Sequence, residues 1–356
     1  MFSRSKQPKI GVIGSVLVDI IATPAQSQKE DSEGNVSINI GGCAYNICYN
    51  LRKLNCKVSL FSVLKDESIL TPFILNKLKQ EKINHSFVFL DKTVPEGLFV
   101  SHAENKSSSK AVTSTCIDKA QLNFEKIRTF ISKNDIIACD LGLSSAQLST
   151  IIKICDKKGK KLICNGTSDG RINRITALDE GQKLYAIIMN SSQALTILPN
   201  FENLLEEEKY EEILLTSRAK NVIVTKSDKG MIRIDEAGEC KRFPASTAPT
   251  VVTTIGAGDA LTACVATASA GNNSDSFLGQ NSSTRFSSKF NQIMPDVLAE
   301  EGATKGSDAL FDHGVVTMGY GRKKSHKVLG IDRDVWMVSG ILLAVIGLVI
   351  TAITVF

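Results

Sequence analysis

The chain has 356 residues, of which 43% are hydrophobic and 22% are charged. This length and composition are typical of a globular protein with one large domain or two ordinary ones, and they exclude a chain without a hydrophobic core. The formal net charge of +5 is small for the length, and the Lys and Arg residues are scattered. The charge therefore gives no indication of a nucleic-acid partner.

The cysteines indicate a reducing compartment. There are nine of them, without a C-x-x-C pair and without a histidine at metal-binding spacing. Several lie in apolar strand or helix patterns, where a thiol behaves as a small hydrophobic group. We expect reduced, buried thiols in a domain that faces the cytosol. The first expected strand begins at Lys9 with no apolar leader before it, so no secretion signal is predicted.

Strand and helix patterns alternate from residue 9 to about residue 270. Short apolar runs predict strands at 9–13, 58–63, 135–139, 161–164, 186–189 and 222–225. Apolar residues at helical spacing predict helices at 44–54, 69–81, 122–132, 146–157 and 210–218. Near-continuous apolar strands are typical of a parallel sheet covered on both faces. We therefore expect an α/β fold in which helices flank a mostly parallel central sheet.

Two segments interrupt this alternation, at residues 23–40 and 87–112. Both carry short alternating patterns and polar turns. The pattern predicts a small β sheet that forms a lid on the open edge of a site.

The first strand leads into polar residues that suit a ligand with vicinal hydroxyls. Gly14-Ser15 is followed by Asp19, and the pair Gly41-Gly42 opens a helix that carries Asn46. Paired glycines allow a close approach of the backbone to a ligand, while Asp and Asn supply acceptors and a donor. Two interpretations are open for Asp19, a ligand contact or an ordinary surface carboxylate.

A glycine-rich turn, Gly256-Ala257-Gly258-Asp259, opens an apolar helix pattern that runs from Leu261 to Ala270. Free N–H groups at the positive end of a helix form a cradle for phosphate, and a carboxylate inside the cradle can act as a base. In isolation, the motif is better explained as a tight strand-to-helix turn with Asp259 as a dipole partner. The other motifs of the chain favour the cradle.

The C-terminal part differs in character from the rest. Residues 271–334 are rich in Asn, Ser and Gly and predict a flexible tether. Residues 335–356 carry no charge and as a helix would extend about 33 Å, enough to cross a bilayer core of about 30 Å. Arg322, Lys323, Lys324 and Lys327 precede this segment and would stay on the cytosolic side. We expect a transmembrane tail anchor with the preceding domain in the cytosol; the alternative is a buried helix.

A resemblance to a known family follows from the order of the motifs. In chain order these are Gly14-Ser15 with Asp19, Gly41-Gly42 with Asn46, residues 222–225 with Gly230, and Gly256-Ala257-Gly258-Asp259. Over residues 9 to 270 this order resembles that of the ribokinase-like, or PfkB-type, carbohydrate and nucleoside kinases. The resemblance implies a mostly parallel sheet with a β lid, and ATP-dependent phosphorylation of a sugar or nucleoside hydroxyl with Mg²⁺ on the phosphates.

The resemblance also implies roles for individual residues. Asp259 would take the proton of the acceptor hydroxyl, and the turn formed by Gly256, Ala257 and Gly258 would hold the transferring phosphoryl group. Asp19, Gly41, Gly42 and Asn46 match the positions that hold the sugar. Asn190, Thr225, Ser227 and Gly230 match positions on the nucleotide side, where Asn190 organises Mg²⁺ through water. No direct metal ligand is assigned, and the family's lids often pair between subunits, which implies a possible homodimer.

Several positions depart from the family pattern. The glutamate of the family's Asn-x-x-Glu element is Gln193, the threonine before the glycine-rich turn is Ile255, and the glycine of the nucleotide loop is Ser227. A family glycine after an apolar strand is Lys65, and the helices that wall the adenine pocket in the family are replaced by the tether.

These departures leave two hypotheses. The first is a membrane-anchored kinase that acts on a small sugar or a nucleoside. The second is a degenerate kinase fold that serves as a membrane-tethered binding or scaffolding module. Because Asp259 is retained inside its cradle, the sequence favours the kinase. The acceptor stays open among ribose, fructose-type sugars and nucleosides, pseudouridine included.

Overall fold

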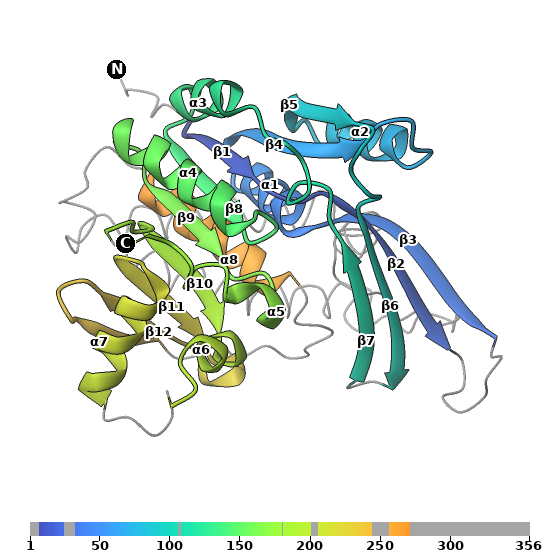
Figure 1. Ribbon diagram of the computed structural model, residues 1–356. Helices are drawn as coiled ribbons and strands as arrows, with labels where there is room; N and C mark the ends of the chain where they lie inside the picture. Colours follow the sequence, from blue (N-terminus) through green and yellow to red (C-terminus); the bar gives the residue numbers. More distant parts are fainter. Residues whose placement is uncertain are drawn as a thin grey trace, which may run out of the picture.

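The computed structural model describes residues 7–24, 33–105, 108–179, 181–200, 206–243 and 256–270. A nine-stranded main sheet and a four-stranded lid sheet organise them (Figure 1). In spatial order the main sheet contains β13 (Cys240–Phe243), β12 (Met231–Asp235), β11 (Asn221–Thr225), β10 (Ala186–Asn190), β9 (Leu162–Asn165), β8 (Ile136–Asp140), β1 (Lys9–Ile13), β4 (Lys57–Lys65) and β5 (Asn84–Asp91).

The main sheet is mostly parallel, as the sequence predicts. All neighbours from β11 to β5 pair in parallel, and only β12 and β13 at one end are antiparallel. The six strands expected from the sequence are present, with ends that differ by at most two residues. Every residue of β8 is buried, which explains why its sequence is apolar without alternation.

Helices cover both faces of this sheet. They are α1 (Cys43–Lys53), α2 (Thr71–Gln80), α3 (Phe124–Lys133), α4 (Ser145–Lys157), α5 (Asp169–Ile172), α6 (Ser191–Ile197), α7 (Glu206–Ser217) and α8 (Ala257–Ser269). One core cluster joins α1, α2 and α8 to the sheet, and the other joins α3, α4, α6 and α7 to its opposite face. Alternate residues of β8 belong to the two clusters: Ile136 and Ala138 to one, Ile137 and Cys139 to the other.

Local signals explain where some of these helices begin. Ser144 caps α4, accepting a hydrogen bond from the backbone of Gln147, whose side chain in turn accepts from the Ser144 backbone. Asn190 and Gln193 form the same reciprocal capping box at the start of α6. At α8 no side chain caps the helix, and the N-cap is Gly256 in the left-handed conformation with φ 80°.

The lid sheet consists of β3 (Gly34–Gly41), β2 (Leu17–Pro24), β6 (Leu98–Asn105) and β7 (Ser108–Ser114), in that spatial order. It extends away from one side of the main sheet (Figure 1). Its bounds differ from the expected segments 23–40 and 87–112. The lid already begins at Leu17, and residues 84–91 form β5, which pairs with β4 in the main sheet.

The C-terminal predictions fall outside the described residues. This applies to the tether at 271–334 and to the apolar segment at 335–356. Among the residues that are described, no helix is long and apolar enough to cross a membrane. All nine cysteines are free thiols, and all but Cys43 and Cys240 are buried, as expected for a reduced protein.

Candidate active site

The candidate site lies where β8 and β9 end, between the N-termini of α1 and α8 and the lid strands β2 and β3 (Figure 1). Parallel strands end at one edge of their sheet, and the helices that follow begin there, so polar side chains and helix N-termini converge. Four of the predicted residues meet at this edge: Asp19, Gly41, Asn46 and Asp259.

Asp259 lies in the first turn of α8 and is buried, with 5% of its surface exposed. The turn at Gly256 leaves the first N–H groups of the helix without intrahelical acceptors, at the positive end of the helix dipole. Burial is the main cause that raises the pKa of Asp259 to about 7. The carboxyl group can therefore exchange a proton near neutral pH.

Two asparagines hold the carboxyl group of Asp259. Nδ2 of Asn46, on α1, donates to Oδ2 over 2.9 Å. Nδ2 of Asn165, at the end of β9, donates to Oδ1 over 3.1 Å. The thiol of Cys43 also hydrogen-bonds Asp259, and both this bond and that from Asn46 lower its pKa against the effect of burial. These contacts fix the orientation of the Asp259 carboxylate, and a base acts efficiently only when it is held in a fixed orientation.

Asn46 has one polar atom left over. Its Oδ1 is buried and has no hydrogen-bond partner among the described residues, while its Nδ2 is used by Asp259. A buried acceptor without a donor costs stability unless a ligand or water supplies the donor. A hydroxyl group of a ligand bound beside Asp259 would supply such a donor.

Asp19 approaches the same region from the lid, on β2. Only 8% of its surface is exposed, and burial raises the pKa of Asp19 to about 7. A Cβ on Gly41 would lie 2.1 Å from Oδ2 of Asp19, so only glycine fits there. Gly42 has a φ of 92°, and its Cβ would lie 2.6 Å from the carbonyl oxygen of Ser15. The predicted glycine pair is therefore required by backbone conformation and by the position of Asp19.

Asp140, at the end of β8, is a central residue that the sequence analysis missed. It is fully buried and accepts hydrogen bonds from the Ser15 backbone and hydroxyl, from the Ala44 backbone and from the Gly142 backbone, over 2.6–2.9 Å. Burial raises the pKa of Asp140, while the bonds from Ser15 and Gly142 lower it. The carboxyl group joins the loop after β1 to the start of α1 and thereby places Asn46.

Asn165 is the second missed residue. Besides Asp259, its Nδ2 approaches Oγ1 of Thr262 at 3.1 Å, and its Oδ1 accepts from the Thr167 backbone over 2.7 Å. A signal was present for both missed residues, because each directly follows an apolar run expected to be a parallel strand.

The predicted nucleotide-side residues lie at the ends of the neighbouring strands β10 and β11. Asn190 and Thr225 are paired in the parallel register. Ser227 begins a short 3₁₀ turn at Ser227–Lys229, and Gly230 follows it with a φ of 85°. These residues share the strand-end edge with Asp259, but no hydrogen bond links them to it within the described ranges.

Gln193 has a structural role at the position where the family carries glutamate. Its Oε1 accepts from the Asn190 backbone over 3.0 Å, and its own backbone donates to Oδ1 of Asn190 over 2.8 Å. Gln193 is buried, with 5% of its surface exposed. A neutral amide fills this buried capping position without the cost of desolvating a charge.

We expect Asn165→Asp to raise the pKa of Asp259. The change replaces a donor to Asp259 by a second carboxyl group, so the pKa of Asp259 should rise further above 7 and activity at neutral pH should fall about 10- to 100-fold. Titration of Asp259 by NMR in both proteins measures this. Thr262→Val, which removes the other hydrogen-bond partner of Asn165 Nδ2, is the control and should leave the pKa of Asp259 nearly unchanged.

Comparisons of the sequence and of the fold identify the proteins that this chain resembles. The model of the pfkB family of carbohydrate kinases matches residues 7–279. A search of curated proteins gave no match. Among solved structures, a ribokinase from Giardia lamblia is 14% identical with a TM-score of 0.62, covering 77% of this chain and 88% of that one. A ribokinase from Arabidopsis thaliana in complex with ribose and ATP is 16% identical with a TM-score of 0.60, covering 74% and 86%. A ribokinase from Thermotoga maritima is 18% identical with a TM-score of 0.58, covering 74% and 86%.

Proposed function

Because the chain belongs to the pfkB family of carbohydrate kinases, which are ATP-dependent phosphotransferases, we propose that it phosphorylates a hydroxyl group of a small sugar or nucleoside with Asp259 as the base. The observation that carries this proposal is the buried Asp259 at the uncapped start of α8, with a pKa of about 7 and two asparagine donors.

The acceptor side of the site would work as follows. Asp19, from the lid, and Oδ1 of Asn46 accept hydrogen bonds from acceptor hydroxyls, while Gly41 and Gly42 let the lid backbone approach the sugar. Asp259 takes the proton of the reacting hydroxyl. Base catalysis of this kind contributes about 10²- to 10⁴-fold to rate.

The phosphate side would use the start of α8. The backbone N–H groups of Ala257, Gly258 and Asp259 lie at the positive end of the helix dipole. Gly256 provides the left-handed turn before them, and no side chain caps the helix. They suit the charge on a transferring phosphoryl group. ATP fits this start of the helix, with Asn190, Thr225, Ser227 and Gly230 on its nucleotide side; a structure of a Cryptococcus neoformans ribokinase contains ADP.

Mg²⁺ would be held mainly by the phosphates of ATP and by water. In the described part of the chain no three His, Cys, Asp or Glu side chains form a metal cluster. Mg²⁺ commonly keeps several waters and takes few protein ligands, so this arrangement suits it. The ion would neutralise phosphate charge. Asn190, at the start of α6, matches the asparagine of the family's Asn-x-x-Glu element and would help to position the ion through water.

A homodimer through the lid is part of the proposal. The face of the lid opposite Asp19 carries Ile38, Ile20, Val100 and Val112 in one row, paired in register across all four strands. Ile38 is 57% exposed, Val100 44% and Val112 75%. An exposed apolar row of this kind favours a contact with a second lid.

Membrane attachment through residues 335–356 is also proposed. It is supported by the uncharged apolar run and the preceding basic residues in the sequence. The kinase domain would then lie on the cytosolic side of the membrane.

A degenerate kinase that only binds ligands is the second candidate. It is favoured by Gln193, which serves as a helix cap, and by Ser227, which has a strained φ of 53° where the family has glycine. Mg²⁺-ATP affinity separates the two candidates, because the scaffold requires none.

We expect Ser227→Gly to stabilise the nucleotide loop. A non-glycine residue in the left-handed region costs about 1 kcal/mol, and Ser227 adopts a φ of 53° without being buried. Urea denaturation should show a gain of about that size. Lys229→Gly, in the same turn but without a positive φ, is the control and should lower the free energy of unfolding.

The function is tested by transfer of labelled γ-phosphate from Mg²⁺-ATP to a panel of sugars and nucleosides, with ribose, fructose and pseudouridine included. A labelled product with one acceptor class supports the proposed kinase and names its substrate. If no product forms and the folded protein does not bind Mg²⁺-ATP, the binding module is the correct function.

A further inference from the structure

Lysines precede or begin every parallel strand of the main sheet. They are Lys9 at β1, Lys57 at β4, Lys82 before β5, Lys133 before β8, Lys160 and Lys161 before β9, Lys183 before β10, and Lys220 before β11. Parallel strands begin at one edge of a sheet, so these residues gather at the edge opposite Asp259. We name these eight residues the lysine edge.

A part of this pattern has an ordinary cause. The helices α1, α3 and α4 end at the same edge and carry basic residues in their last turns. A cation at a helix C-terminus stabilises that helix whether or not anything binds it. The residues before β10 and β11, Lys183 and Lys220, do not belong to a helix, so the helix dipoles do not account for the whole edge.

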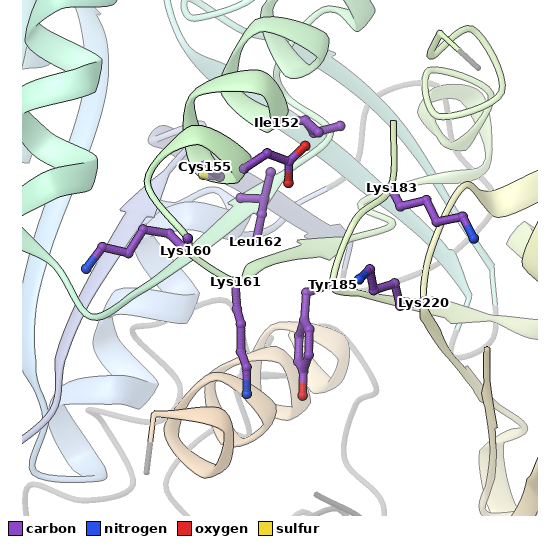
Figure 2. A pocket seen from close by; sticks show the side chains of 10 residues that line it. Ile152, Cys155, Lys160, Lys161, Leu162, Lys183, Tyr185 and Lys220 are labelled. Carbon is purple, nitrogen blue, oxygen red and sulfur yellow. The ribbon is translucent and has the colours of Figure 1, made fainter. Parts of the chain in front are cut away.

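A cavity of about 160 Å³ lies within the lysine edge, between the end of α4 and the starts of β9 and β10 (Figure 2). Lys160, Lys161, Lys183 and Lys220 line it, together with Tyr185. Figure 2 shows Lys160 and Lys183 extending to opposite sides, while Lys161 lies beside the ring of Tyr185. The amines are spread over the surface and do not converge on one point, which suits several anionic headgroups better than one small anion.

Little negative charge balances these lysines. Among the cavity-lining residues only Asp156 is acidic. Nζ of Lys220 lies 4.0 Å from Oε1 of Glu236, an exposed pair at the limit of an ion pair. Nζ of Lys161 lies 4.5 Å from the centre of the Tyr185 ring. An exposed pair of this kind leaves most of the positive charge available.

The chain leaves the described part of the domain at this edge. Helix α8 runs from Asp259 at the opposite edge to Thr267, whose hydroxyl lies 3.4 Å from the thiol of Cys56, next to Lys57. Residues 271–356 follow, and they contain the basic residues 322–327 and the apolar segment 335–356. The last described residues of the domain therefore lie at the lysine edge.

We infer that the lysine edge docks on anionic lipid headgroups, with Asp259 and the lid turned away from the bilayer. A lysine close to an anionic membrane surface strengthens binding about fivefold, or about 1 kcal/mol. In this orientation the lid and the buried carboxyl groups Asp19, Asp140 and Asp259 lie at the edge away from the bilayer. The inference depends on lysines of the folded domain and not on the kinase reaction.

Lysine acetylation of the full chain on vesicles tests the inference. The chain is mixed with vesicles of phosphatidylcholine alone or with about one third phosphatidylserine, and acetylation rates are read by mass spectrometry. We expect Lys160, Lys161, Lys183 and Lys220 to react at least about threefold more slowly on the anionic vesicles, and high salt to remove this protection.

Two charge-matched variants complete the test. Lys160→Gln, Lys161→Gln, Lys183→Gln and Lys220→Gln together should abolish the protection of Lys57 and Lys82. The control is the combination Lys65→Gln, Lys92→Gln, Lys119→Gln and Lys126→Gln, on other surfaces, which should keep it. Equal rates on both vesicles, or loss of protection in both variants, would overturn the inference. Equal protection by free inorganic phosphate would also overturn it, since the cavity would then be a small-anion site.

Discussion

Asp259→Asn is expected to lower kcat about 10²- to 10⁴-fold for whichever acceptor is phosphorylated. The change removes the only group placed to take the hydroxyl proton at the start of α8 in the described structure, while an amide keeps the shape of the side chain and an acceptor oxygen for Asn46 or Asn165. Steady-state kinetics at saturating ATP and acceptor measure the loss.

The same variant should be more stable than the unchanged protein at pH 8. Burial raises the pKa of Asp259 from an unfolded value of about 3.9 to about 7, so its contribution to folding is fully present below pH 4 and is lost as the pH rises to 7. The loss amounts to about 4 kcal/mol, and the neutral amide avoids it. Asp156→Asn, exposed on α4, is the matched control and should change neither activity nor stability. A folded Asp259→Asn protein that keeps a tenth of the activity would exclude Asp259 as the base.

Asp140→Ala is expected to lower the free energy of unfolding by about 3–5 kcal/mol. The carboxyl group of Asp140 accepts from the backbones of Ser15, Ala44 and Gly142 and from the Ser15 hydroxyl, and all of these donors would stay buried without an acceptor. Because Ala44 lies at the start of α1, the position of Asn46 should be disturbed as well. Urea denaturation at pH 7 measures the loss.

Asp156→Ala serves as the control for a carboxyl group without such partners, since Asp156 is exposed. Its effect should stay within about 0.5 kcal/mol. Asp140→Asn should fall between the two, because an amide keeps one acceptor oxygen but sets its NH₂ group against a donor. A loss below about 1 kcal/mol for Asp140→Ala would contradict the structural role given to this residue.

The regular part of the fold is predictable from the sequence because its signals are local. The strand at 136–140 is buried on both faces, so an uninterrupted apolar run marks it. The glycine-rich turn at 256–258 predicts the start of α8 for a similar reason, since Gly256 needs a left-handed conformation. The glycine pair at 41–42 is explained by the close approach of Asp19 and Ser15.

The remaining features depend on contacts that no local pattern records. Asp140 binds Ser15, 125 residues away in the chain, and Asn165 binds Asp259, 94 residues away. From residue 87 on, the strand β5 is expected in the lid, because the segment 87–112 carries short alternating patterns and polar turns. It is an edge strand of the main sheet, and an edge strand has the same alternation.

The departures from the family pattern also have physical explanations within the fold. Gln193 and Asn190 form the capping box at the start of α6, so the helix begins normally although Gln193 lacks the charge of the family's glutamate. Ser227 adopts a left-handed conformation of the kind that favours glycine, with a φ of 53°. Both residues preserve local structure, so these two departures leave the fold around the site intact and do not by themselves separate the kinase from the binding module.

The pH dependence of kcat/KM for the acceptor tests the account most directly. It should rise with pH around pH 7, where both Asp19 and Asp259 ionise, because Asp259 accepts the hydroxyl proton only above its own pKa. Asn165→Asp should move this pKa upward. A profile that stays flat between about pH 5 and pH 8 would contradict the role of Asp259 as the base, whatever the rate.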